Sequence, residues 1–155
     1  MKKLIPFIVL FAISLNTSAQ SVPSGYIDLG LPSGTIWKKV NESGFFTCDQ
    51  ALGRFYNSLP TEEQWEELKN NCNWIWTGNG YRVIGPNHNV IFLPASGYQK
   101  CSGNEKGVGS IAYYQSKTIV DEYQVWALGF GENEIVIDVL RRCEGLCVHL
   151  IYNGH

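Results

Sequence analysis

The stretch Leu59–Leu68 reads L-P-T-E-E-Q-W-E-E-L, and it carries the clearest structural signal in the chain. Thr61 is followed three residues later by Gln64, which is the spacing of a capping box at the start of a helix. Two glutamates stand between them, in a first turn where the helix dipole favours acidic side chains. Trp65 and Leu68 are three residues apart, so they would face one side of that helix. The stretch therefore predicts an amphipathic helix that begins after Thr61.

Short β-like segments surround this helix on both sides in the sequence. The dipeptide Asn79-Gly80 separates two aromatic-rich segments, which is a strong signal for a β-hairpin. A weaker helical pattern covers 46–56. The expected strands lie at 26–29, 35–37, 74–76, 81–84, 90–93, 123–130 and 134–140. Helices and short strands in this order, without an internal repeat, predict an α+β domain with two short helices and small antiparallel sheets.

The region from 94 to 114 carries four glycines and no regular pattern, so we expect a long loop there. Loops of this length inside a compact domain are often functional. Tyr98, Tyr113 and Tyr114 lie in or beside it, and loop tyrosines make good contacts to sugars or proteins. These three residues are the candidate ligand-binding residues. The alternative is that they pack the loop onto the sheet.

Composition and charge exclude several classes of protein. The chain has 155 residues, of which 45% are hydrophobic, 13% aromatic and only 17% charged. This composition does not suit a disordered chain, whereas it suits one aromatic-rich globular domain. The formal net charge of −2 gives no electrostatic reason to bind nucleic acid.

The N-terminus has the pattern of a secretory signal. Two lysines precede an apolar run over 4–15, which is too short to cross a hydrocarbon core of ~30 Å comfortably. Small residues at 17–19 then offer a cleavage site after Ala19. We expect a signal peptide over 1–19, followed by a single domain over 20–155. The protein would then be exported to the periplasm, the cell surface or the medium, without stable membrane insertion.

Five cysteines are present, and an exported protein can form disulfides. Because five is odd, at least one thiol stays free or pairs between chains. A three-residue loop around Glu144 and Gly145 would place Cys143 opposite Cys147, so this pair is the predicted disulfide. The spacing of the cysteines and histidines does not match a structural zinc site.

Five motifs, in the same order along the chain, resemble the Fibrobacter succinogenes major paralogous domain family. This resemblance spans roughly 25–152 and implies an exported protein with a C-type-lectin-like fold, related to that of formylglycine-generating enzymes. It also implies that the N- and C-terminal strands pair and that a long loop region lies above a small sheet. The motifs are Y-I-D-L-G-L-P-S-G-T-I-W (26–37), L-P-T-E-E-Q-W-E-E-L (59–68), N-C-N-W-I-W (71–76), G-Y-R-V-I-G-P-N (80–87) and I-F-L-P-A-S-G-Y (91–98).

The sequence contains few of the residues that a calcium-dependent sugar site or a catalytic site would need. A calcium-dependent lectin site needs several carboxylate and amide oxygens, but the tripeptide at 85–87 lacks the carboxylate and Trp-Asn-Asp is absent. Cys143 and Cys147 could instead form the copper-binding thiol pair of an oxidase. A G-x-S-x-G nucleophile motif does not occur. We therefore assign no catalytic residue, metal ligand or cofactor.

The favoured hypothesis is a non-enzymatic, exported module that recognises a protein or glycan through its long loop region. One alternative is a small periplasmic inhibitor or immunity-type protein that covers a partner. Another is a thiol-dependent enzyme of the formylglycine-generating type. An exposed apolar patch would indicate a protein partner, whereas a shallow polar groove with an aromatic side chain would indicate a sugar.

Overall fold

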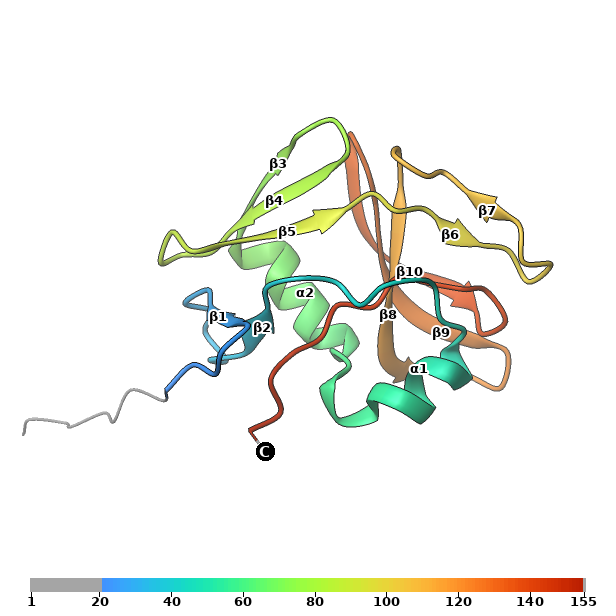
Figure 1. Cartoon of the computed structure of the whole chain (residues 1–155), viewed down its shortest axis with the longest axis horizontal. Coiled ribbons are helices and arrows are strands. Elements are labelled where there is room, and N and C mark those ends of the chain that lie inside the picture. The colour runs from blue at the N-terminus through green and yellow to red at the C-terminus, as the bar shows by residue number, and fades with distance from the viewer. Residues whose placement is uncertain (1–20, 155) are drawn as a thin grey trace, which may run out of the picture.

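The computed structural model describes residues 21–154, so the predicted signal peptide over 1–19 lies outside the described residues. Two α-helices, one 3-10 helix and ten strands form this part of the chain (Figure 1). The α+β prediction is confirmed, and every predicted strand is present to within one residue at either end. The elements are β1 (Tyr26–Asp28), β2 (Ile36–Lys38), α1 (Cys48–Phe55), η1 (Tyr56–Ser58), α2 (Glu62–Asn71), β3 (Asn73–Trp76), β4 (Gly80–Ile84), β5 (Val90–Pro94), β6 (Tyr98–Gln99), β7 (Glu105–Lys106), β8 (Ala112–Ile119), β9 (Gln124–Gly131) and β10 (Glu134–Arg141).

Both helices begin at a capping box. In α2 the Gln64 backbone N–H donates to the Thr61 hydroxyl over 3.1 Å, and the Thr61 N–H donates to the Gln64 side chain over 2.9 Å. Trp65 and Leu68 are fully buried, which confirms the predicted core face. In α1 Thr47 is the cap, again with a glutamine at the third helical position.

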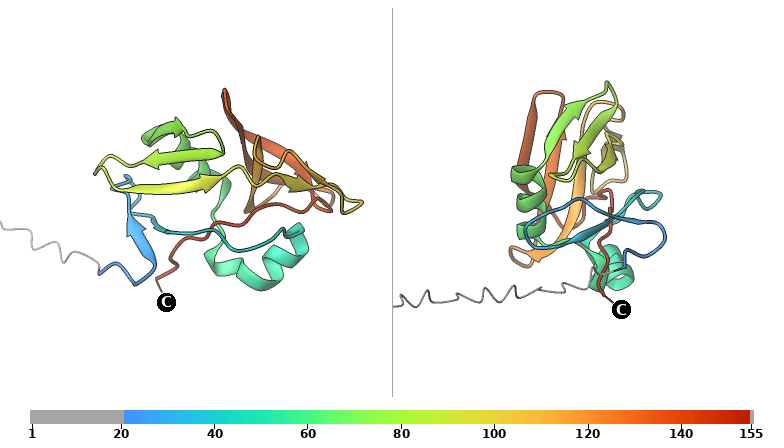
Figure 2. Two further views of the ribbon diagram at one scale, coloured as in Figure 1. Left: turned by 45° about the horizontal axis from the view of Figure 1, so that its top comes forward. Right: turned by 90° about the vertical axis from the view of Figure 1, so that its left-hand side faces the viewer.

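Two three-stranded antiparallel sheets form most of the fold, with orders β3-β4-β5 and β10-β9-β8. The hairpin predicted at Asn79-Gly80 joins β3 to β4, and the Thr77 N–H donates to the Gly80 carbonyl across its turn. Helix α2 contacts all three strands of the β8–β10 sheet (Figure 2). Buried aromatic rings fill the space between these elements, with the rings of Trp37 and Trp65 4.9 Å apart.

The two ends of the described chain pair with each other, as the fold prediction required. The Lys38 N–H donates to the Leu150 carbonyl and the Tyr152 N–H donates to the Ile36 carbonyl, each over 2.9 Å. Trp37 lies opposite Ile151 in this antiparallel bridge. The C-terminal segment thus lies beside β2, close to the start of the described chain (Figure 1).

The region from 94 to 114 is more regular than expected. Strands β6 and β7 pair within it as a small hairpin, and β8 begins at Ala112. We call residues 97–110 the arm, because they extend beyond the two main sheets (Figure 1). The arm returns to the body of the fold at both ends, where the Gly97 N–H donates to the Ile111 carbonyl and the Gly109 N–H to the Ala95 carbonyl.

The predicted Cys143–Cys147 disulfide is wrong. Cys143 is bonded to Cys101 of the arm, with 5.0 Å between their Cα atoms, and Cys147 is a free, buried thiol. The chain after β10 does not fold back onto that strand. Instead Cys147 pairs in parallel with Tyr114 of β8, and its N–H donates to the Tyr113 carbonyl. Cys143 therefore holds the arm through a disulfide, whereas Cys147 is part of the buried core.

Candidate functional site

Two of the three predicted ligand-binding tyrosines meet. The rings of Tyr98 and Tyr113 are 5.1 Å apart at an angle of 90°, and both residues are half-buried. The Tyr113 ring also covers Gly129 of β9, where an added Cβ would lie 2.6 Å from a ring carbon. Burial and the nearby Asp138 carboxylate raise the pKa of Tyr113. The pair packs the arm onto the β8–β10 sheet, which is the alternative interpretation of these tyrosines.

The third tyrosine, Tyr114, is fully buried, so it does not lie on the surface with the other two. Adjacent residues of a strand point to opposite faces, so Tyr113 and Tyr114 cannot share one surface. The Tyr114 ring packs against Phe130 and Trp65. Its hydroxyl lies 2.8 Å from both the Pro94 carbonyl and the Asn41 amide, and burial raises its pKa well above the usual value.

A hollow of about 570 Å³ lies where the N-terminus of α1, the β8–β9 turn and the end of β10 come together. We call it the Tyr123 cleft, after the aromatic residue at its edge. It is lined by Thr47, Asp49, Glu122, Tyr123, Arg141, Arg142 and Cys143. Its size falls within the range of small-molecule pockets, but its open form also suits a protruding protein side chain.

Tyr123 is the most exposed large hydrophobic residue in the described chain, at 72%. Asp121 orders the turn that presents it, because its carboxylate accepts hydrogen bonds from the N–H groups of Tyr123 (2.8 Å) and Gln124 (2.9 Å). Ile119, the last residue of β8, and Val120, which follows it, are 38% and 40% exposed. The end of β8 and the turn after it thus display three apolar side chains to solvent.

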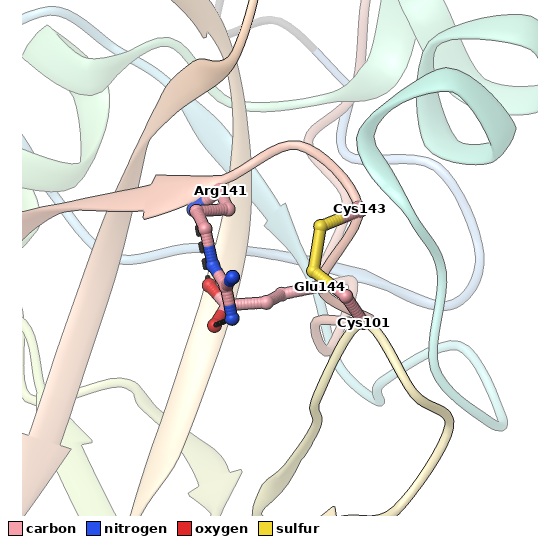
Figure 3. The surroundings of a disulfide bond; sticks show 4 residues. All are labelled: Cys101, Arg141, Cys143 and Glu144. Carbon is pink, nitrogen blue, oxygen red and sulfur yellow. Dashed lines mark hydrogen bonds and ion pairs between the residues drawn. A yellow bond between two sulfur atoms is a disulfide. The ribbon is translucent and has the colours of Figure 1, made fainter.

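Two arginines line the other side of the Tyr123 cleft, and each has an acidic partner. Arg142 forms an ion pair with Asp49 at 2.7 Å, and its backbone N–H donates to the Tyr123 carbonyl. Arg141 lies 3.4 Å from the Glu144 carboxylate, which also accepts the Arg141 backbone N–H (Figure 3). The Arg141 side chain is 63% exposed, so its guanidinium keeps donors available for a further partner.

The disulfide holds the arm against this edge of the molecule. Figure 3 shows Cys101 of the arm bonded to Cys143, close to the Arg141–Glu144 pair. Two backbone hydrogen bonds support the same contact, because Gln99 and Gly145 exchange N–H and carbonyl groups over 2.8 and 2.9 Å. The edge of the Tyr123 cleft is therefore fixed covalently as well as by hydrogen bonds.

The three free thiols lie in surroundings that keep them protonated. Burial raises the pKa of Cys147 to about 12, that of Cys72 to about 11, and that of Cys48 above its ordinary value. Reactive thiols normally have lowered pKa values. Within residues 21–154 no cluster of metal-ligating side chains is present, and no helix is long and apolar enough to cross a membrane.

Comparison of this chain with protein-family models, with curated proteins and with solved structures finds no match.

The sequence interpretation missed Tyr123 because it placed this residue at the start of a strand. Strand β8 was not predicted, so no turn was predicted between β8 and β9. The available signal was Asp121, a residue type that often orders turns by accepting N–H groups two and three positions further on.

Proposed function

We propose that this protein is an exported binding module that recognises another protein through the Tyr123 cleft and the adjoining β8–β9 turn. The observation that carries the proposal is the 72% exposure of Tyr123 on a turn ordered by the Asp121 carboxylate. Because the backbone of this turn is already ordered, the turn loses little conformational entropy when Tyr123 becomes buried in a partner.

The apolar character of the turn favours a protein over a sugar. Ile119 and Val120 precede Tyr123 by a few residues, and more than a third of the surface of each is exposed. Exposed apolar patches rimmed by polar residues mark protein-binding sites. Tyrosine and arginine are also the residue types that dominate the binding energy of protein interfaces, and Arg141 supplies a solvent-accessible guanidinium at the same site.

Export and family membership belong to this proposal as well. The sequence over 1–19 has the features of a signal peptide, and the Cys101–Cys143 disulfide suits an oxidising compartment. The motif order described above supports membership of the Fibrobacter succinogenes major paralogous domain family with its lectin-like fold, and the paired chain ends agree with that proposal.

Site-specific photo-crosslinking tests the proposed surface. We would place a benzophenone amino acid at position 123 and, as a matched control, at Val108 of the arm, which is 62% exposed. Each variant would be irradiated in envelope extracts of the producing cell and in host-surface extracts. We expect one protein to be captured at position 123 only, and to be displaced by unlabelled wild-type protein.

The captured protein would then be purified and its affinity measured directly. We expect Tyr123→Ala to weaken binding at least tenfold, since a central aromatic residue of an interface contributes about 2 kcal/mol or more. Equal capture at 123 and 108, or an unchanged affinity of Tyr123→Ala, would contradict the proposal. If the partner is an enzyme that loses activity on binding, the module is an inhibitor.

A further inference from the structure

Strand β10 forms an open edge of the β8–β10 sheet. It is eight residues long and pairs with β9 over its whole length without a bulge, and no described strand pairs with its other side. Its sequence, E-I-V-I-D-V-L-R, contains neither lysine nor proline. Natural proteins usually protect an edge strand with those residues, with a bulge or by keeping the strand short. By these criteria β10 is available to a further strand.

The hydrogen bonds of β10 show which of its backbone groups point outward. The Val139 N–H donates to the Asp138 carboxylate, so this N–H is not directed at β9. Because the direction alternates along an antiparallel strand, the N–H and carbonyl groups of Ile135 and Ile137 point outward as well. Within the described chain these outward groups of Ile135 and Ile137 have no hydrogen-bond partner.

We infer that two copies of this protein pair through β10, so that their two three-stranded sheets join into one antiparallel sheet. A two-fold axis perpendicular to the sheet relates such strands and keeps the same face of each copy on the same side. With the axis at Ile137, this residue lies opposite its own copy, and Ile135 lies opposite Val139 of the second copy. All three residues have outward backbone groups. Each of these opposed pairs can therefore exchange two N–H to carbonyl hydrogen bonds.

Charge favours this register over its neighbours. Moving the axis by one residue would place Asp138 opposite Asp138 of the second copy in one direction, and opposite Glu134 in the other. Like charges directly opposite each other destabilise a strand pair. With the axis at Ile137, Asp138 instead lies opposite Val136, and Glu134 lies opposite Leu140. This register therefore opposes no two carboxylates.

The two ends of β10 carry opposite charges, which suits antiparallel pairing with a second copy. Glu132 in the preceding turn and Glu134 at the start of the strand are exposed, and neither forms an ion pair within the described chain. The strand ends at Arg141, whose side chain is 63% exposed. Antiparallel pairing places the acidic start of each copy beside the basic end of the other. Such complementary charges fix the register and favour this partner over a chain without them.

The Asp138 carboxylate limits the strength of the dimer. It already accepts the Val139 N–H in the single chain, so this N–H reaches the second copy only if it leaves the carboxylate. Pairing of two strands alone also covers less surface than a stable interface needs. We therefore expect a reversible equilibrium between monomer and dimer. Since Arg141 lines the Tyr123 cleft, the dimer carries one such cleft at each end of the paired strands.

Sedimentation equilibrium of the purified protein over a range of concentrations tests the inference. We expect the average mass to rise from that of one chain toward that of two as the concentration increases to about 1 mM. Amide exchange measured by NMR in the same samples identifies the surface. Exchange of the Ile135 and Ile137 N–H groups should slow in proportion to the fraction of dimer, whereas exchange at Val108 of the arm should not change.

Two matched variants at Val136 test the register. Val136→Glu places a carboxylate opposite Asp138 of the second copy, whereas Val136→Lys places an ammonium group there and removes the same valine. Thermal unfolding establishes that both variants fold. We expect Val136→Glu to weaken the dimer at least tenfold and Val136→Lys to dimerise at least as well as the wild type. Asp138→Ala frees the Val139 N–H and should strengthen the dimer.

Three results would overturn the inference. One is the mass of a single chain at every concentration, which would leave this edge to a segment of another protein. Another is a dimer in which Ile135 and Ile137 exchange as fast as in the monomer, because it would use a different surface. The third is equal dimerisation of the two Val136 variants, or weaker dimerisation of Asp138→Ala. The inference does not rest on the proposed function, and none of these results bears on Tyr123, so the two can fail separately.

Discussion

The hydroxyl of Tyr81 in β4 lies 2.7 Å from the carbonyl oxygen of Gly131 at the end of β9 and donates a hydrogen bond to it. The same hydroxyl is 2.8 Å from the Glu132 carbonyl. One side chain thereby joins the β3–β5 sheet to the β9–β10 turn. Burial raises the pKa of Tyr81, so the hydroxyl remains a donor at all physiological pH values.

Replacing Tyr81 by phenylalanine removes this link and keeps the ring. We expect Tyr81→Phe to lower the free energy of unfolding by about 1 kcal/mol, because two carbonyl groups lose their shared donor. Urea denaturation gives this value. Tyr123→Phe is the matched control, since that side chain is largely exposed and should change stability by less than about 0.5 kcal/mol. Equal effects of the two variants would contradict the role of Tyr81.

The capping box of α2 predicts the effect of changing Thr61. Thr61→Ala removes the acceptor of the Gln64 N–H and should cost about 1 kcal/mol of stability. Thr61→Ser keeps a hydroxyl and should cost much less. Chemical denaturation of the two variants side by side separates the cap from the lost methyl group. If Thr61→Ser lost as much stability as Thr61→Ala, the hydroxyl would not be the stabilising group.

His149 predicts how stability depends on pH. Its pKa is about 4 in the folded protein and about 6.5 in the unfolded chain, so the unfolded state takes up the proton first as the pH falls. Stability should therefore decrease between about pH 6.5 and pH 4, by about 3 kcal/mol in total. Below about pH 4 both states bind the proton and this contribution stays constant.

Denaturation curves at pH 7, 5.5 and 4 measure this loss. The His149→Gln variant, if it folds, has no imidazole and supplies the control for the carboxylates that also titrate in acid. We expect the wild type to lose more stability than this variant by about 3 kcal/mol across the range. Parallel pH profiles for the two proteins would contradict a neutral, buried imidazole.

The disulfide gives a prediction with two measurements. A digest of the unreduced protein should contain the Cys101 and Cys143 peptides joined, and mass spectrometry identifies them. Because the two cysteines are 42 positions apart in the sequence, Cys101→Ser/Cys143→Ser should cost about 4 kcal/mol. Cys72→Ser, which removes a thiol outside any disulfide, is the control. A Cys143–Cys147 linkage in the digest would contradict the structure.

Local signals in the sequence were enough for much of the fold. The cap at Thr61 and the turn at Asn79-Gly80 depend on residues a few positions apart, and both predictions are confirmed. Strand β8 gave no such signal because it buries Gln115 and Ser116 beside Tyr114, so apolar and polar residues do not alternate along it. Its burial depends on contacts with distant segments, including Trp65 and Cys147.

The candidate site was harder to predict for the same reason. Because β8 was not predicted, the opposite orientations of Tyr113 and Tyr114 could not be deduced. The turn that presents Tyr123 could not be recognised for the same reason. The partner of Cys143 could not be predicted either, because Cys101 comes close to Cys143 only through the path of the arm in the folded chain. Proximity in the sequence favoured Cys147, which instead follows a tight turn that leads it into the core.

The pairing of the two chain ends has a practical consequence for attaching this domain to something else. Tyr26 and Tyr152 bring their rings within 5.6 Å, so both ends of the described chain emerge on one side (Figure 1). The arm extends from the opposite side. A fluorescent tag, a surface tether or a neighbouring domain joined at either end would therefore leave the arm facing outward. Immobilisation through either terminus should accordingly give the same orientation on a sensor chip.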